Sequence, residues 1–197
     1  DGYRLALRRE PIVSDLTTRF IVPGKTLAEI SKLLKEEDEE AYLALSQKHI
    51  VFRIGGYYVV SRLLEGEFLD YNAAIPKVSK TTVKINTRSL TDAVERTSLL
   101  ISDRLRSPIR LSAMDQKVQL NCSTSMGKAH DEVDCEMSGE AVSMGFNNKY
   151  LMDALKASDC DMVKLEINGA LSPMRILPLE GESFLFLVLP VRVKNDD

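Results

Sequence analysis

Apolar residues recur at helical spacing in three segments of the chain, and each segment has a basic residue two positions before its first leucine. The three starts are Lys25-Thr26-Leu27, Arg88-Ser89-Leu90 and Lys149-Tyr150-Leu151. The leucines lie roughly sixty residues apart, a spacing typical of a repeated structural unit. A short apolar run precedes each predicted helix and strand-like runs follow it. The pattern therefore predicts a β-α-β-β-β unit that occurs three times.

The predicted strands are short runs of apolar or alternating residues between turn signals. Residues 20–22, 83–85 and 143–146 open the three units. The runs after the helices are 42–45, 50–54 and 57–63 in the first unit, 109–114, 118–123 and 132–137 in the second, and 163–167, 174–177 and 184–189 in the third. A further strand at residues 3–7 belongs to none of the units, and an odd number of units leaves one without a partner.

The connections between the units differ in length and composition. Ser138-Gly139-Glu140 is a short turn, so we expect the second and third units to share one sheet system and one core. Residues 66–77 form a long, aperiodic stretch with Pro76 near its end, which is typical of a domain linker. We therefore expect a boundary that separates residues 1–76 from residues 77–197. The unpaired first unit and the start at Asp1 indicate a C-terminal piece of a longer protein.

The composition is that of a globular protein without a membrane segment. The chain has 197 residues and a net charge of −3, and no apolar run approaches the roughly eighteen residues that a membrane span needs. Cys122, Cys135 and Cys160 form no Cys-x-x-Cys pair, so neither a disulfide framework nor a zinc site is expected. Such thiols and the lack of a signal peptide favour a cytoplasmic protein, and no motif requires a cofactor.

Basic residues gather on the predicted helices, whereas acidic residues gather elsewhere. The basic positions are Lys25, Lys32 and Lys35 on the first helix, Arg88 and Arg96 on the second, and Lys149 and Lys156 on the third. Acidic residues are concentrated at 36–40 and 131–136. Such segregation gives one face of the molecule an attraction for a polyanion. The alternative interpretation is an ordinary set of solvated helix faces.

No arrangement of residues points to catalysis within the chain. His49 lies at the start of a predicted strand and His130 in a predicted polar loop, and neither has a partner at a recognisable nucleophile spacing. The sequence contains no phosphate-binding glycine loop, no Gly-x-Ser-x-Gly and no His-Glu-x-x-His. We therefore expect a binding protein rather than an enzyme.

The last predicted strand ends in a way that favours a binding surface. Residues 184–189 are continuously apolar, which is typical of a strand that is buried on both faces. Pro190 has no amide proton to donate to a ladder, so we expect strand pairing to end there. Leu189, Val191 and Arg192 would then lie at a sheet margin and be available to another surface. The alternative is a core strand that simply ends.

Five motifs along the chain form a set. They are Asp1-Gly2-Tyr3-Arg4-Leu5-Ala6; Ile21-Val22-Pro23-Gly24-Lys25; Arg62-Leu63-Leu64-Glu65-Gly66-Glu67-Phe68-Leu69-Asp70-Tyr71, followed by Ile75-Pro76; Gly145-Phe146-Asn147-Asn148-Lys149-Tyr150-Leu151; and Leu189-Pro190-Val191-Arg192. In order and spacing the set resembles the bacterial sliding clamp, the beta subunit of DNA polymerase III. Each motif alone is a weak signal, but together they cover essentially the whole chain.

The resemblance implies an α+β DNA-clamp fold, in which repeated β-α-β-β-β units, three copies here, place helices on one face of antiparallel sheets. Residues 1–76 would be the second half of the middle clamp domain, and residues 77–197 the complete third domain. The family acts as a processivity factor, a ring-shaped homodimer around duplex DNA without sequence specificity. Carried over by position, the DNA-facing residues are Lys25, Lys32, Lys35, Arg88, Lys149 and Lys156, and the dimer contact is Leu99 and Leu100.

The resemblance also implies a hydrophobic cleft that docks the polymerase alpha subunit, clamp-loader subunits and other proteins with a clamp-binding motif. Its residues here would be Gly2, Tyr3, Arg4, Leu5, Leu69, Ala73, Ala74, Asn147, Tyr150, Leu171, Pro173, Leu187, Val188, Leu189, Pro190, Val191 and Arg192. The sequence departs from the family at Leu69, which replaces a proline, and at Tyr3, where many members have histidine. Ala73 and Ala74 are smaller than the arginine and valine that some members have there, and the tail at 193–197 would partly cover the cleft.

Two other function classes fit the pattern when the resemblance is set aside. One is a peptide- or small-molecule-binding module of an unrelated repeated β-α-β-β-β fold with no role on DNA. The other is a regulatory domain of an enzyme whose catalytic part lies upstream. Neither accounts for the order of the motifs.

Overall fold

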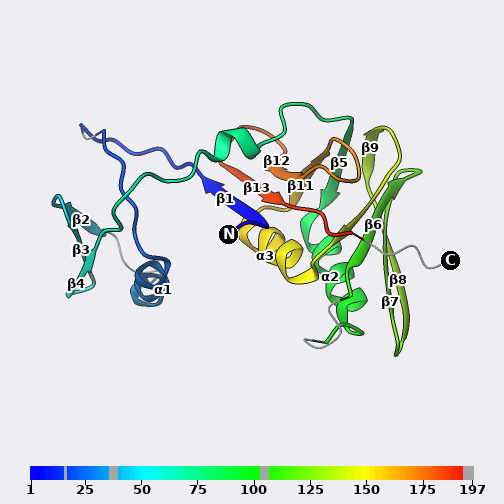
Figure 1. Cartoon of the computed structure of the whole chain (residues 1–197), viewed down its shortest axis with the longest axis horizontal. Coiled ribbons are helices and arrows are strands. Elements are labelled where there is room, and N and C mark those ends of the chain that lie inside the picture. Colours follow the sequence, from blue (N-terminus) through cyan, green and yellow to red (C-terminus); the bar gives the residue numbers. More distant parts are fainter. Residues whose placement is uncertain (16, 36–39, 103–106, 193–197) are drawn as a thin grey trace. The chain divides into compact units, whose positions relative to one another are not determined.

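The structure is a computed structural model, and it describes residues 1–15, 17–35, 40–102 and 107–192 (Figure 1). The chain forms two compact units. The smaller unit is Ile12–Asp70, and the larger unit combines Asp1–Pro11 with Tyr71–Asp197. None of the helices in the described ranges is both long and apolar enough to cross a membrane.

The larger unit holds most of the strands and two of the helices. Its elements in chain order are β1 (Arg4–Arg8), a short 3-10 helix (Tyr71–Ala74), β5 (Thr81–Asn86), α2 (Thr87–Ser98), β6 (Ile109–Met114), β7 (Lys117–Thr124), β8 (Gly127–Asp134), β9 (Glu136–Gly139), β10 (Val142–Phe146), α3 (Asn148–Ser158), β11 (Met162–Ile167), β12 (Met174–Pro178) and β13 (Phe184–Val188). They form two antiparallel sheets, one in the order β1-β13-β12-β11-β5-β9 and one in the order β10-β6-β7-β8.

The second and third repeat units exchange their opening strands. β5 opens the second unit but pairs with β11 of the third, with Val83 opposite Leu165. β10 opens the third unit but pairs with β6 of the second, with Met144 opposite Leu111. The prediction that these two units share one sheet system is therefore confirmed, because each unit completes the sheet of the other.

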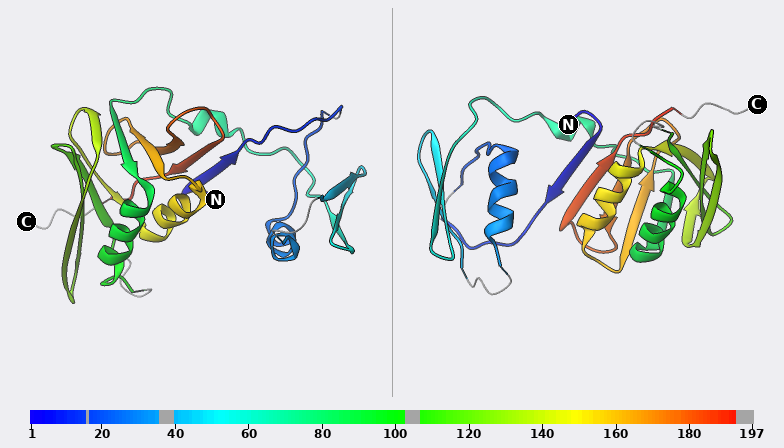
Figure 2. Two further views of the ribbon diagram at one scale, coloured as in Figure 1. Left: turned by 180° about the vertical axis from the view of Figure 1, so that it is seen from behind. Right: turned by 90° about the horizontal axis from the view of Figure 1, so that it is seen from below.

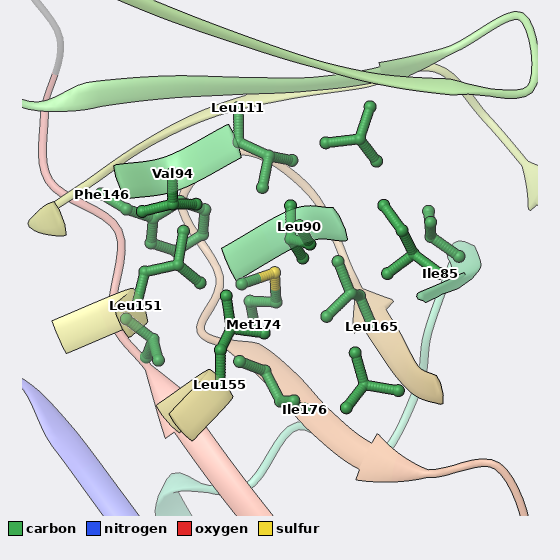
Figure 3. Close-up of a cluster of buried hydrophobic side chains, with 14 of the residues drawn as sticks. Ile85, Leu90, Val94, Leu111, Phe146, Leu151, Leu155, Leu165, Met174 and Ile176 are labelled. Carbon is green, nitrogen blue, oxygen red and sulfur yellow. The ribbon is translucent and has the colours of Figure 1, made fainter. Parts of the chain in front are cut away.

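The two helices of the larger unit lie side by side and pack against the sheets (Figure 2). α2 contacts strands of both sheets, and α3 contacts β12 and β13. Figure 3 shows the core that they enclose, in which Leu90, Leu151 and Phe146 are fully buried. The first leucine of each of these helices thus fills the same core, as helical periodicity predicts.

The smaller unit consists of one helix and one three-stranded sheet. α1 (Gly24–Leu33) packs on a sheet in the order β2-β3-β4, formed by β2 (Tyr42–Leu45), β3 (His49–Ile54) and β4 (Tyr57–Arg62). Its buried core is Ile30 of the helix together with Ile50, Phe52 and Ile54 of β3. The smaller unit therefore has a much smaller core than the larger one.

The prediction of a single strand at residues 132–137 is wrong. Those residues belong to two strands in different sheets, β8 and β9, and β9 pairs with β5. Gln116 stabilises the break, because its side-chain carbonyl accepts from the Met137 N–H and its amide donates to the Met137 carbonyl. His130 lies within β8 rather than in the predicted loop. The exposed side of this strand is entirely polar, so the sequence of the strand does not show a clear alternation of apolar and polar residues.

The turn predicted at Ser138-Gly139-Glu140 begins later than expected, because Ser138 and Gly139 still pair with β5. Gly139 has a φ of +100°, and a β-carbon there would lie 1.9 Å from the Lys80 carbonyl oxygen. Both the backbone conformation and the close approach require glycine at this position.

Three other strand predictions need correction at their ends. Residues 20–22 form no strand, and Ile21 makes one isolated bridge with Leu64. The opening strand starts at Arg4 and joins the sheet of the third unit through β13. Pairing does not end at Pro190, because Val191 bridges to Gly145 of β10. The proline interrupts the ladder for lack of an N–H, and the chain then changes partner.

Candidate functional site

A groove of about 340 Å³ lies between β1 and α3 in the larger unit. It is lined by Asp1, Arg4, Leu5, Ala6, Tyr150, Asp153, Ala154, Ala157, Phe186, Leu187 and Val188. β1 pairs with β13 from Arg4 opposite Val188 to Arg8 opposite Phe184, so the two strands present one continuous surface beside the helix. The lining is mainly apolar, and three charged side chains add polar groups to it.

Arg4 connects the first strand to α3. Its guanidinium pairs with the Asp1 carboxylate, at 2.9 Å from Nε to Oδ2, and with the Asp153 carboxylate, and its Cζ lies 4.5 Å from the centroid of the Tyr150 ring. The Tyr3 ring stacks on the same Tyr150 ring, with centroids 6.0 Å apart. Two carboxylates and an aromatic face hold the guanidinium in one orientation. The aromatic end of the groove is therefore pre-formed.

The segment after β13 is hydrogen-bonded on both sides although the strand has ended. The Leu189 N–H donates to the Tyr3 carbonyl at 2.9 Å, and the Val191 N–H donates to the Gly145 carbonyl at 2.8 Å. Leu189, Pro190 and Val191 are half-buried, and Arg192 is exposed. These bonds fix the backbone of the terminal segment between the first strand and β10.

The predicted cleft residues fall into three sets. The first, Arg4, Leu5, Tyr150, Leu187 and Val188, lines the groove. The second belongs to segments that adjoin it, namely Gly2, Tyr3, Asn147, Leu189, Pro190, Val191 and Arg192. The third set lies away from the groove lining. It consists of Ala73 and Ala74 in the 3-10 helix, Leu171 and Pro173 in the β11–β12 turn, and Leu69 in the smaller unit. The tail at 193–197, expected to cover the cleft, lies outside the described residues.

Sequence reasoning missed six residues of the lining: Asp1, Ala6, Asp153, Ala154, Ala157 and Phe186. A readable signal existed for three of them, because Asp153, Ala154 and Ala157 follow Tyr150 at i+3, i+4 and i+7 on α3. The three residues are identified by following the helix face that carries Tyr150 toward the end of α3.

Each helix has a basic residue and no acidic residue in its first turn. Lys25, Arg88 and Lys149 occupy these positions, and all three are exposed. A positive charge at this end opposes the helix dipole, so it does not stabilise the helix. A cationic side chain at a helix start adds to the positive end of the helix dipole, and the two together attract anions.

The other basic positions differ in their partners. Lys32, Lys35 and Lys156 are all exposed, and Lys32 pairs with Glu29 at 2.9 Å. Arg96 Nε donates to Asp131 Oδ2 at 2.7 Å and so links α2 to β8. The Arg96 hydrogen bond holds the pKa of the Asp131 carboxyl below its usual value.

Two leucines follow the last turn of α2. Leu99 is 79% exposed, and Leu100 is half-buried with its Cδ1 4.0 Å from the position of a β-carbon on Gly127. Gly127 starts β8, the strand at the open edge of the four-stranded sheet. An exposed leucine near an open sheet edge provides surface suited to a protein contact.

The described residues offer no group of three or more His, Cys, Asp or Glu side chains that could hold a metal ion. The three cysteines are free thiols. Burial raises the pKa of the Cys122 and Cys135 thiols, which keeps them in the less reactive protonated form.

Two family descriptions match the chain. The central domain of the DNA polymerase III beta subunit matches residues 1–70, and its C-terminal domain matches residues 72–192. The Beta sliding clamp of Staphylococcus epidermidis is 33% identical over 195 residues, and that of Staphylococcus aureus is 34% identical over 196 residues. In both comparisons the match covers 98% of this chain and 52% of the relative.

Solved structures give the same result. The DNA polymerase sliding clamp from Bacillus subtilis superposes with a TM-score of 0.92 at 31% identity, over 98% of this chain and 52% of that one. A putative DNA polymerase III beta subunit from Eubacterium rectale gives 0.89 at 31% identity, over 97% of this chain and 52% of that one. The chain spans about half the length of the relatives that it matches. Its predicted DNA-clamp fold is confirmed, and the chain belongs to the DNA polymerase III beta subunit family, the bacterial sliding clamps.

Proposed function

We propose that the protein acts as the processivity factor of the bacterial replicative DNA polymerase, as a non-catalytic accessory subunit. Residues 1–76 would supply the second half of the middle clamp domain, and residues 77–197 the third domain. The full-length protein would form a homodimeric ring around duplex DNA. This chain would contribute the docking cleft for partner proteins and part of the DNA-facing surface.

The observation that carries the proposal is the groove between β1 and α3. Segments far apart in the sequence meet there, and Arg4, Leu5, Tyr150, Leu187 and Val188 come together in one lining. A partner peptide would bury leucine and phenylalanine side chains against these walls, at roughly 1.5–3 kcal/mol each. The cost of ordering the peptide reduces this gain and leaves exchangeable binding, which suits a site that several partners share.

Polar groups at the groove would orient the peptide. Arg4 is held by two carboxylates and the Tyr150 ring, so it offers donors without a large ordering cost. The expected partners are the polymerase alpha subunit, clamp-loader subunits and other proteins with a clamp-binding motif. Ligand binding has precedent in the family, since the sliding clamp from Bartonella birtlesii, 29% identical, was solved bound to griselimycin.

Contact with DNA would come from the helices. Lys25, Arg88 and Lys149 place a positive charge in the first turn of each helix, where it does not stabilise the helix. Lys32, Lys35 and Lys156 would add to the same attraction, although Lys32 is also paired with Glu29. Contacts of lysine and arginine with phosphate carry no sequence information. Such a surface would attract DNA and still let a ring slide along it.

Closure of the ring would use the end of α2. Leu99 and Leu100 offer apolar surface there, and β8 offers an open sheet edge. In the family the contact joins the third domain of one subunit to the first domain of its neighbour. We therefore expect this contact in the full-length protein.

The proposal is tested by titrating a peptide that contains Gln-Leu-Ser-Leu-Phe between polar flanks into the whole chain in a calorimeter. We expect saturable micromolar binding that Leu189→Ser removes, because the substitution takes away apolar surface in the segment that adjoins the groove and that the backbone bond to Tyr3 holds in place. The matched control is Met126→Ser, an exposed apolar residue in the β7–β8 turn. Binding that survives Leu189→Ser, or no binding to the chain, would contradict a cleft at this place.

A further inference from the structure

The three-stranded sheet of the smaller unit has one face that α1 does not cover (Figure 2). α1 packs on the side of Ile50, Phe52 and Ile54, so the alternate residues of the strands point to the other side. We call that side the outer face. It consists of Tyr42 and Ala44 of β2, His49, Val51 and Arg53 of β3, and Tyr58, Val60 and Arg62 of β4. None of these residues is acidic, although the chain has a net charge of −3.

Tyr42, Arg53 and Tyr58 form a row across the outer face. Arg53 lies opposite Tyr42 on one neighbouring strand and opposite Tyr58 on the other. Its Cζ lies 4.2 Å from the centroid of the Tyr42 ring, so the guanidinium covers one side of that ring. Arg53 is exposed, and Tyr42 and Tyr58 are 49% and 70% exposed. Two aromatic rings and a planar cation are therefore presented to solvent from strands that lie about 4.8 Å apart.

Apolar and basic residues continue the outer face beside this row. Val51 lies opposite Val60, which is 64% exposed, and His49 lies opposite Arg62. His49 and Arg62 are both exposed. Arg62 pairs with Glu65 at 3.2 Å, but a pair between two such exposed side chains is weak and is readily exchanged for another partner. The outer face thus offers two arginines with apolar surface between them.

The outer sides of the two sheets in the larger unit have a different composition. In the part of the chain that the structure describes, their strands place no tyrosine, phenylalanine or tryptophan on that side. Basic residues there are accompanied by acidic ones, as in the pairs of Lys84 with Glu136 and of Lys117 with Glu132. Exposed rings beside basic residues on acid-free strands therefore distinguish the outer face of the smaller unit.

Completion of the clamp domain would leave the outer face free. In the larger unit each repeat joins the sheet of the other edge to edge, through β5 and β10, and both helices pack on the core side. His130 and Glu132, on the outer side of β8, remain exposed. A neighbouring repeat would in the same way extend the sheet of the smaller unit and cover its α1 side. Exposure of the outer face thus follows from the fold of the domain.

We infer that the outer face of the smaller unit binds single-stranded nucleic acid. Single strands expose the flat faces of their bases, and proteins bind these faces by stacking them on aromatic rings and arginine planes. Tyr58 and the stacked pair of Arg53 and Tyr42 would receive bases, while Arg53 and Arg62 would attract the phosphates. A duplex hides its base faces, so this site differs from the duplex contact proposed for the helices. The inference goes beyond the proposed function and does not depend on it.

An acidic peptide is the other ligand that a basic surface attracts. It would need the arginines but not the tyrosine rings, because carboxylates bind guanidinium groups through charge and hydrogen bonds. The rings flank Arg53 on both neighbouring strands, which favours a ligand that carries planar groups as well as negative charge. Nucleic acid has both.

Glu40 is an acidic residue at the margin of the outer face. Its carboxylate accepts a hydrogen bond from the Tyr42 hydroxyl, so it lies beside the ring that Arg53 covers. A negative charge in this place repels phosphate groups. Glu40→Gln should therefore bind a single strand about two to three times more tightly, and misfolding does not produce such a gain.

The test is fluorescence anisotropy of a labelled oligothymidylate of about 12 nucleotides, titrated with the whole chain at low salt. We expect saturable binding. Tyr58→Ala should raise the dissociation constant at least about fivefold, because one stacking partner is lost, and Tyr58→Phe should keep the affinity of the parent chain. The matched control is Tyr57→Ala. Tyr57 is 57% exposed and lies opposite Ile54 on the α1 side, so its loss should leave the constant unchanged.

A second pair of variants tests the charge. Arg53→Gln should raise the dissociation constant at least about tenfold and make the affinity less dependent on salt, because it removes both a stacking plane and a phosphate contact. Its matched control is Arg9→Gln. Arg9 is an exposed arginine of the larger unit that pairs with Glu182 at 2.9 Å, and its replacement should leave the constant unchanged.

Competition experiments separate stacking from charge. An abasic strand of the same length, duplex DNA and polyglutamate should each compete at least about tenfold more weakly than unlabelled oligothymidylate. Equal competition by polyglutamate or by the abasic strand would show that charge alone is recognised, which overturns the inference. No binding at low salt also overturns it, and so does an affinity that Tyr58→Ala leaves unchanged or that Tyr57→Ala lowers to the same extent.

Discussion

The larger and the smaller unit are built from the same repeat, yet they differ in how much of it they bury. The larger unit encloses both of its helices and both of its sheets in one core, whereas the smaller unit buries Ile30 and three residues of β3. The leucine that opens each helix makes the contrast plain, being buried in α2 and α3 and half exposed in α1. Hydrophobic periodicity thus identifies the face that an element is built to bury, and a partner decides whether that face is buried.

The largest difference between the two units is expected when the first leucine of a helix is replaced by alanine. Leu90→Ala should destabilise the larger unit by about 2–5 kcal/mol, because it leaves a cavity in a close-packed core. Leu27→Ala should cost the smaller unit less than about 1 kcal/mol, because about half of the Leu27 side chain is already exposed. Urea unfolding followed by hydrogen exchange resolves the two units. Equal costs at the two positions would show that the exposed face of α1 is buried after all.

A smaller effect is expected from glycines that hold positive φ angles in the two units. Gly56→Ala, at a φ of +86° with open space around it, should cost about 1–2 kcal/mol through backbone strain alone. Gly139→Ala should cost about 1–3 kcal/mol more, because the new β-carbon overlaps the Lys80 carbonyl and pushes β9 from β5. Thermal unfolding of both variants measures the difference. If the two variants lose similar amounts of stability, β9 can move away from β5 without a free-energy cost.

The smallest effect concerns the ion pair between α2 and β8, which has no described counterpart on α1. The pKa of Asp131 is lowered in the folded state, so its ionised form stabilises the fold at neutral pH. This stabilisation is lost as the pH falls through the lowered pKa, because the folded state must then bind the proton too. Asp131→Asn should therefore lower the melting temperature slightly at neutral pH and not at strongly acidic pH. If the melting temperatures of the variant and the parent chain differ by the same amount at every pH, the effect comes from packing and not from the charge of Asp131.

Much of the architecture could be predicted because it depends on local patterns. The first turns of the helices, which hold Lys25, Arg88 and Lys149, and most strands follow from the spacing of apolar residues. The exchange of β5 and β10 between the repeats could not be predicted from the sequence. The pattern of apolar residues shows that a strand is buried, but it does not show which strand lies beside it. The break between β8 and β9 escaped for the same reason, because it depends on hydrogen bonds from Gln116.

The candidate site was predictable only in part. Of the groove lining, Arg4, Leu5, Tyr150, Leu187 and Val188 were identified by carrying positions over from the family resemblance. Ala154 and Ala157 carry no chemical signal of their own, and they matter because small side chains leave room beside Tyr150. Asp153 lies on the helix face of Tyr150, but its pairing with Arg4, far away in the sequence, follows only from the fold.

The exchange of opening strands also determines when the larger unit can fold during synthesis. One of the two partners of β5, β11, leaves the ribosome about eighty residues later, and β13, the partner of β1, leaves it about 180 residues after β1. Until β11 and β13 have been translated, β5 can pair only with β9 and β1 has no neighbour in its sheet, and the apolar face of α2 has no complete core to join. The complete sheet of this unit can therefore form only after β11 and β13 have been made.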